Sequence, residues 1–125
     1  MSQIIVTIDG NKIRDFGSFI QEFNQVYSQF DVCWNGNLDA FNDYLSWPDV
    51  KYTLIWRHSS LSREKLGYEE MIKWLDQEAQ HCHPSNMLHI QQQLEAAKLG
   101  KSNTMFDLLV DIILSNSDYI QLWLE

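Results

Sequence analysis

Basic side chains are scarce in this sequence. The 125 residues contain 9 Lys plus Arg against 17 Asp plus Glu, so the formal net charge is −8 at pH 7. Binding to DNA or RNA requires clustered Lys and Arg to neutralise phosphates, so the composition argues against a direct nucleic-acid partner. An acidic surface complements a basic one. We therefore expect a basic protein as the partner.

Cysteine pairs, leader sequences and long apolar runs are also missing. The two cysteines, Cys33 and Cys82, lie far apart and form no CxxC motif, which is typical of a reduced cytoplasmic protein. The start MSQIIVTIDGNK has no basic region before its short apolar run, so neither a signal peptide nor a membrane span is expected. The sequence predicts a cytoplasmic chain that is monomeric when free.

Apolar residues are plentiful despite these absences. Hydrophobic residues make up 45% of the chain and there are five tryptophans, enough for one domain spanning 1–125 with a substantial core. Apolar, β-branched or aromatic runs predict strands at 4–8, 52–56 and 119–124. Amphipathic stripes and cap residues predict helices beginning near residues 15, 37, 68, 84 and 104.

Strands separated by helices are typical of a parallel sheet, because parallel neighbours need long crossover connections. The expected fold class is therefore α/β, with a three-stranded parallel β-sheet packed with about five helices. No repeat or low-complexity segment interrupts the pattern.

Common catalytic and metal-binding motifs are missing as well. The sequence has no GxSxG, P-loop or GxGxxG motif. The run His81-Cys82-His83 is the best metal candidate, but adjacent residues converge poorly on one ion, so we expect no metal and no cofactor. Glu69-Glu70 near a helix start is interpreted as a solvated face, and a hydrolase reading rests only on such scattered carboxylates.

The segment WNGNLDAFNDYL, residues 34–45, is the most informative stretch. Asn37 is a good N-cap, and Leu38, Phe41 and Leu45 form an inward stripe. Asp39 and Asp43 then lie one turn apart on the opposite side, with no Lys or Arg nearby. Like charges at this spacing weaken a helix slightly. The pair is either an ordinary solvated face or a surface that binds a cationic partner.

This segment resembles the barstar-like family of intracellular ribonuclease inhibitors. NLDAFNDYL is close to the family's characteristic helix, and the strand ending Leu54-Ile55-Trp56-Arg57 matches its strand that finishes in Trp-Arg. The first strand with its Asp-Gly turn and the final helix-plus-strand unit also fit. The resemblance covers roughly residues 4–57 and 106–124, and region 58–101 carries an extra helical insertion of about thirty residues.

The resemblance implies that the chain is a protein inhibitor or immunity-type protein, not an enzyme. In that family an acidic helix and its preceding loop plug the active site of a basic ribonuclease. By position, Asp43 would mimic the substrate phosphate and Asp39 would be its companion carboxylate. The full set of expected partner-binding residues is Asp43, Asp39, Asp111, Asn37, Trp34, Gly36, Asn42, Trp47, Asn35 and Cys33.

The chain departs from the family pattern at several of these positions. Cys33 replaces a tyrosine that packs in the enzyme cleft, Asn42 replaces a tryptophan, and Asn35 and Gly36 shift the loop glycine by one position. The inserted helices leave an alternative open, in which the chain is a binding module for another basic protein. Deleting region 67–100 would discriminate between the two, since loss of the partner with the fold intact favours the insertion.

Overall fold

The computed structural model describes residues 4–125. Three strands, β1 (Ile4–Asp9), β2 (Tyr52–Arg57) and β3 (Ile120–Leu124), form one sheet in the order β1-β2-β3. Both pairings are parallel, with Val6 opposite Leu54 and Leu54 opposite Leu122. The predicted three-stranded parallel sheet is confirmed.

The described residues form six α-helices where about five were expected. They are α1 (Phe16–Tyr27), α2 (Leu38–Leu45), α3 (Ser59–Lys65), α4 (Tyr68–His81), α5 (Met87–Lys98) and α6 (Met105–Leu114). Short 3₁₀ turns, η1 (Gly10–Lys12), η2 (Ser28–Phe30) and η3 (Pro84–Asn86), complete the order. The additional helix is α3. Its sequence SSLSREK has no apolar stripe that would have predicted it.

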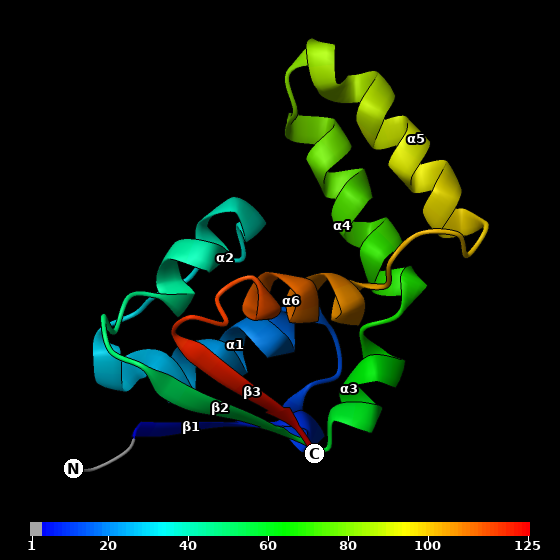
Figure 1. Ribbon diagram of the computed structural model, residues 1–125. Coiled ribbons are helices and arrows are strands. Elements are labelled where there is room, and N and C mark those ends of the chain that lie inside the picture. Colours follow the sequence, from blue (N-terminus) through cyan, green and yellow to red (C-terminus); the bar gives the residue numbers. More distant parts are fainter. Residues whose placement is uncertain (1–3) are drawn as a thin grey trace.

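The main core lies between the sheet and the helices α1, α2 and α6, which cover one face of the sheet (Figure 1). Strand side chains alternate between the two faces. Val6 and Ile8 are therefore buried, whereas Ile5 keeps 54% of its surface exposed. Aromatic rings fill the centre, and Phe19 stacks on Trp56 at 5.3 Å between centroids. Among the described residues no helix combines the length and hydrophobicity needed to span a membrane.

The insertion forms a helical hairpin in which α4 and α5 run side by side and project from the body (Figure 1). A small cluster of Met71, Leu75 and Ala97 holds the two helices together. Trp74 packs against this cluster and also against the main core. At the base of the hairpin, Tyr68 Oη donates to the carbonyls of Gly100 (3.1 Å) and Ser102 (2.6 Å). The hairpin is thus tied to the body through its first two turns.

Candidate protein-binding surface

The loop before α2 is held in one conformation by Trp34. Its backbone exchanges two hydrogen bonds with the Asn24 side chain of α1: Trp34 N–H donates to Oδ1 (2.8 Å), and Asn24 Nδ2 donates to the Trp34 carbonyl (2.7 Å). The indole Nε1–H donates to the Asn37 carbonyl at 2.8 Å. Trp34 also stacks on Phe41 of α2, with 4.5 Å between ring centroids. These contacts fix where α2 begins.

This burial corrects the sequence interpretation of Trp34. Only 1% of its surface is exposed, so its ring cannot serve as an aromatic contact for a partner. An aromatic residue in a loop carries no periodicity that distinguishes a buried anchor from an exposed contact. Trp34 therefore supports the surface from beneath.

Gly36 and Asn37 make the turn into α2. Gly36 has φ +96°, a backbone conformation that favours glycine. A Cβ there would also approach Ile20 Cδ1 to 2.6 Å. The Asn37 side chain accepts from Asp39 N–H at 2.8 Å, so the predicted N-cap is confirmed. The Asn35 side chain accepts from Asn37 N–H at 3.1 Å and tightens the same turn.

The far end of α2 is anchored by buried phenols. Tyr52 Oη donates to the Leu45 carbonyl at 2.7 Å, and the Tyr27 and Tyr52 hydroxyls are 2.7 Å apart. Burial raises the pKa of Tyr52 to about 12 and that of Tyr27 well above its ordinary value. Both phenols therefore remain protonated at neutral pH, and α2 is fixed at both ends.

The outer side of α2 carries the two aspartates. Phe41 and Leu45 are buried, whereas Asp39 and Asp43 are exposed on the opposite side of the helix. Within the described part of the chain, no ion pair involves either carboxylate. Two unpaired negative charges thus lie one turn apart on a rigidly held helix.

Asp111 lies on the outer side of α6, opposite the buried Phe106, Leu109 and Ile113. One Asp111 oxygen lies 3.5 Å from the Asn103 amide nitrogen. The buried sides of α2 and α6 belong to the same core cluster. Asp39, Asp43 and Asp111 therefore lie on helix sides that face away from a shared core.

Asn42 joins these two helices. Its Oδ1 accepts a hydrogen bond from Nδ2 of Asn116, which also donates to the Ile112 carbonyl at 3.0 Å. Asn116 is 8% exposed, whereas Asn42 itself is exposed, so this link lies at the edge of the surface. The amide oxygen of Asn42 thus already accepts one hydrogen bond within the chain, and the exposed side chain is held in place beside α6.

Two other predicted surface residues remain accessible. Trp47, just after α2, is 57% exposed and lies 6.0 Å from the Tyr44 ring. Cys33 is an exposed free thiol. Both can touch a partner that sits on α2.

The described residues contain no group of three His, Cys, Asp or Glu side chains placed to hold a metal ion. In the run His81–His83, the His83 ring pairs with the Ser85 hydroxyl at 2.8 Å. Glu70, expected on a solvated face, is largely buried, with 12% of its side chain exposed. It packs toward the start of α1, a contact between distant segments that local sequence does not reveal.

Comparison with protein-family models matches residues 3–110 to Barstar (barnase inhibitor). The matched stretch includes the loop, α2 and the whole hairpin, and ends within α6. No curated protein and no solved structure matches the chain. The family match covers well over half of the residues and agrees with the parallel sheet and the acidic α2. The chain therefore belongs to the Barstar (barnase inhibitor) family.

Proposed function

We propose that this chain is a non-catalytic inhibitor or immunity-type protein that blocks the active site of a basic ribonuclease. Asp43 on α2 takes the place of a substrate phosphate among the enzyme's cationic side chains, and Asp39 is its companion. Asp111 on α6 makes a third charged contact. Asn35, Gly36 and Asn37 of the loop, with Trp47 and the exposed part of Asn42, surround the carboxylates.

The observation that carries this proposal is the pair of exposed carboxylates on the outer side of α2, which have no cationic partner among residues 4–125. An active site that binds RNA phosphates presents arginine, lysine or histidine side chains. Carboxylates paired with such groups in a water-excluded interface are held by charge-assisted hydrogen bonds. The barnase–barstar complex is the reference system for strong interfacial charge pairs of this kind.

Rigidity of the loop and helix supports the same proposal. Trp34, Asn24 and the Asn37 cap hold the entry to α2, and Tyr52 and Asn116 hold its later part. A surface that already has its bound shape loses little conformational entropy on association. The aspartates are thus presented in a fixed geometry, as an active-site plug requires.

The net charge of −8 supports rapid capture of a basic enzyme. Complementary charge accelerates diffusional encounter, and salt screens that effect. We place this task in the cytoplasm, where an immunity-type protein would protect the cell that makes the ribonuclease. The free thiols of Cys33 and Cys82 suit that compartment. We propose that the chain acts as a monomer.

A competition assay tests the proposal. Barnase and a panel of other small basic ribonucleases are assayed for RNA cleavage with increasing amounts of the purified chain. We expect inhibition of at least one enzyme, competitive with RNA because the carboxylates occupy the phosphate site. Asp43→Ala should weaken the inhibition strongly and Asp39→Ala should weaken it less.

Asp76→Ala is the matched control, because Asp76 is an exposed acid on α4. It should inhibit as wild type does. Non-competitive inhibition, or inhibition that survives both α2 substitutions, would show that another surface is responsible. Absence of inhibition across the panel would count against the ribonuclease assignment itself.

A further inference from the structure

A cleft lies beside the proposed inhibitory surface. Asn35, Gly36 and Asn37 of the loop line one side, and α4 contributes Glu70, Lys73, Trp74, Gln77 and Glu78 on the other. The start of α1, including Asp15, also lines the cleft. Its volume of about 480 Å³ lies within the range of binding clefts, roughly 300–1,000 Å³.

The cleft is continuous with the surface that α2 presents. The same loop residues that turn the chain into α2 and cap it also line the cleft. A partner seated on the loop and on Asp39 therefore lies next to the cleft opening. The opposite wall belongs to α4, so the inserted hairpin stands at the flank of any such partner.

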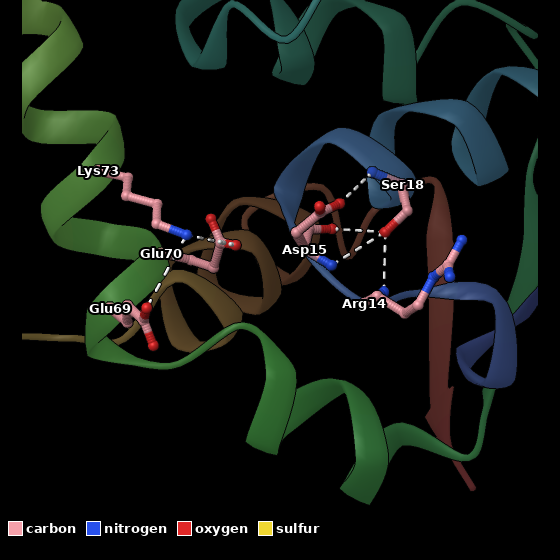
Figure 2. A network of polar contacts seen from close by, with 6 residues as sticks. All are labelled: Arg14, Asp15, Ser18, Glu69, Glu70 and Lys73. Carbon is pink, nitrogen blue, oxygen red and sulfur yellow. Dashed lines mark hydrogen bonds and ion pairs between the residues drawn. The ribbon is translucent and has the colours of Figure 1, made fainter.

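The charge of the cleft is negative. Three carboxylates line it, those of Asp15, Glu70 and Glu78, against the single ammonium of Lys73. Figure 2 shows Glu70 between Lys73 and the start of α1. Lys73 Nζ lies 3.9 Å from both Glu69 and Glu70, so its charge is already shared. The remaining negative charge favours a cationic occupant.

Glu70 illustrates this imbalance. Burial raises the pKa of its carboxyl group and the negative charge of Asp15 adds to that effect, while Lys73 and the Phe16 backbone N–H oppose it. The ionised form of Glu70 is therefore incompletely compensated by the chain itself. A cation beside it would supply the missing compensation.

Arginine fits the cleft better than lysine does. Its planar guanidinium can bind a carboxylate through two parallel hydrogen bonds and can stack on an aromatic ring. Glu70, Glu78 and the half-buried Trp74 all belong to α4 and line the cleft together. Cation–π attraction is strongest for tryptophan among the aromatic residues.

We infer that this cleft is a second contact region for the same basic ribonuclease, and that it receives an arginine side chain from the flank of that enzyme. The inference rests on the proposed function. The hairpin then selects among ribonucleases: α2 provides the general phosphate mimicry, and α4 recognises an arginine that only some of these enzymes present.

A peptide titration tests the chemistry of the cleft without a ribonuclease. The full-length chain is titrated by NMR with acetyl-Gly-Arg-Gly-amide, and with the same peptide containing uncharged citrulline. We expect saturable shifts of the Gly36 amide and the Trp74 indole N–H with arginine only. Shifts spread evenly over the acidic surface, or equal effects of the two peptides, would overturn the inference.

Two charge reversals on α4 provide a matched comparison. Glu78 lines the cleft, whereas Asp76 is exposed on the same helix and does not line it. Glu78→Arg should weaken arginine-peptide binding about fivefold, the size expected for an exposed charge pair, and Asp76→Arg less than twofold. Equal weakening by the two variants would contradict the inference. Thermal unfolding of both variants confirms that they fold.

The ribonuclease assay separates this inference from the proposed function. Against an inhibited enzyme, Glu78→Arg should raise Kd about fivefold or more and Asp76→Arg less than twofold, with inhibition still competitive. Competitive inhibition that is insensitive to Glu78→Arg overturns the cleft inference and leaves the α2 proposal intact. If the chain binds the arginine peptide but inhibits no ribonuclease, both the proposed function and the inference that the cleft and α2 bind the same ribonuclease are overturned.

Discussion

Single residues beneath the acidic surface determine its shape. Trp34 connects the loop to both neighbouring helices, through two backbone hydrogen bonds to Asn24 of α1 and through its ring stacked on Phe41 of α2. None of these groups is expected to touch a partner. They nevertheless fix the positions of Asp39 and Asp43, so under the proposed function their effect on binding is indirect.

Asn24→Ala should reveal this indirect effect. It removes both hydrogen bonds to the Trp34 backbone, at about 1 kcal/mol each, so the free energy of unfolding should fall by about 2 kcal/mol. Inhibition should also weaken, because the loop becomes less ordered before binding. Urea denaturation and the ribonuclease assay measure the two effects.

The neighbouring Gln25→Ala is the control, since Gln25 is exposed and its side chain makes no described contact. It should leave stability and inhibition near wild type. If Asn24→Ala also leaves both unchanged, Asn24 is not needed to hold Trp34 in place, which contradicts the proposed role of the Asn24 bonds.

Among the elements, the start of α1 is where the hairpin meets the body. Asp15 caps α1 by accepting from Ser18 N–H at 2.7 Å, and the Ser18 hydroxyl accepts from Asp15 N–H at 2.9 Å (Figure 2). The bonds to the backbone and side chain of Ser18 lower the pKa of Asp15. Glu70 of α4 approaches the same helix start.

Asp15→Ala should lower the free energy of unfolding by about 1 kcal/mol at neutral pH, the usual cost of losing an N-cap. Because the folded-state pKa is depressed, the ionic part of this stabilisation is present above pH 3.8 and is lost as the pH falls through the folded value. The difference in the free energy of unfolding between wild type and Asp15→Ala should therefore become smaller in acid. Urea denaturation at neutral and acidic pH measures this difference.

Asp15→Asn is the companion variant, because its amide oxygen can still accept from Ser18. It should lose less stability than Asp15→Ala at neutral pH. If the difference in the free energy of unfolding between wild type and Asp15→Ala stays constant across the acid range, the cap does not act through the ionised carboxylate.

Elements with clear periodicity could be predicted from the sequence, and their contacts could not. The apolar stripes predict α1, α2, α4, α5 and α6, and the apolar runs predict the three strands, all close to their observed bounds. The helix α3 was missed because its buried Ser62 is polar. For Asp39 and Asp43, the predicted outward position on α2 agrees with their exposure.

The cleft and the burial of Trp34 and Glu70 escaped prediction for a different physical reason. They depend on contacts between segments far apart in the chain, such as the packing of Trp34 on Phe19 and Phe23 of α1 and the approach of Glu70 to the start of α1. A local pattern records which side of a helix is apolar. It does not record which neighbour covers that side.

At the scale of the whole molecule, two parts contribute differently: the body fixes the position of α2, and the hairpin adds further acidic residues. The sheet and α1 hold α2 in place, and the hairpin projects from the same body (Figure 1). The hairpin helix α4 contributes the acidic residues Glu70 and Glu78 to the cleft. The excess of carboxylates over basic side chains attracts basic proteins through long-range electrostatics, without selecting among them. In the proposed complex, specific recognition comes from the few carboxylates that the ribonuclease would bury.

The most direct measurement is the Kd of an inhibited basic ribonuclease for wild type, Asp43→Asn and Asp76→Asn. Each variant removes one negative charge from an exposed aspartate, so general attraction changes equally. If Asp43 is the phosphate mimic, its substitution should raise Kd about thirtyfold or more, as for hot-spot residues worth about 2 kcal/mol, and Asp76→Asn less than twofold. Equal changes in Kd for the two variants would contradict the claim that α2 occupies the active site.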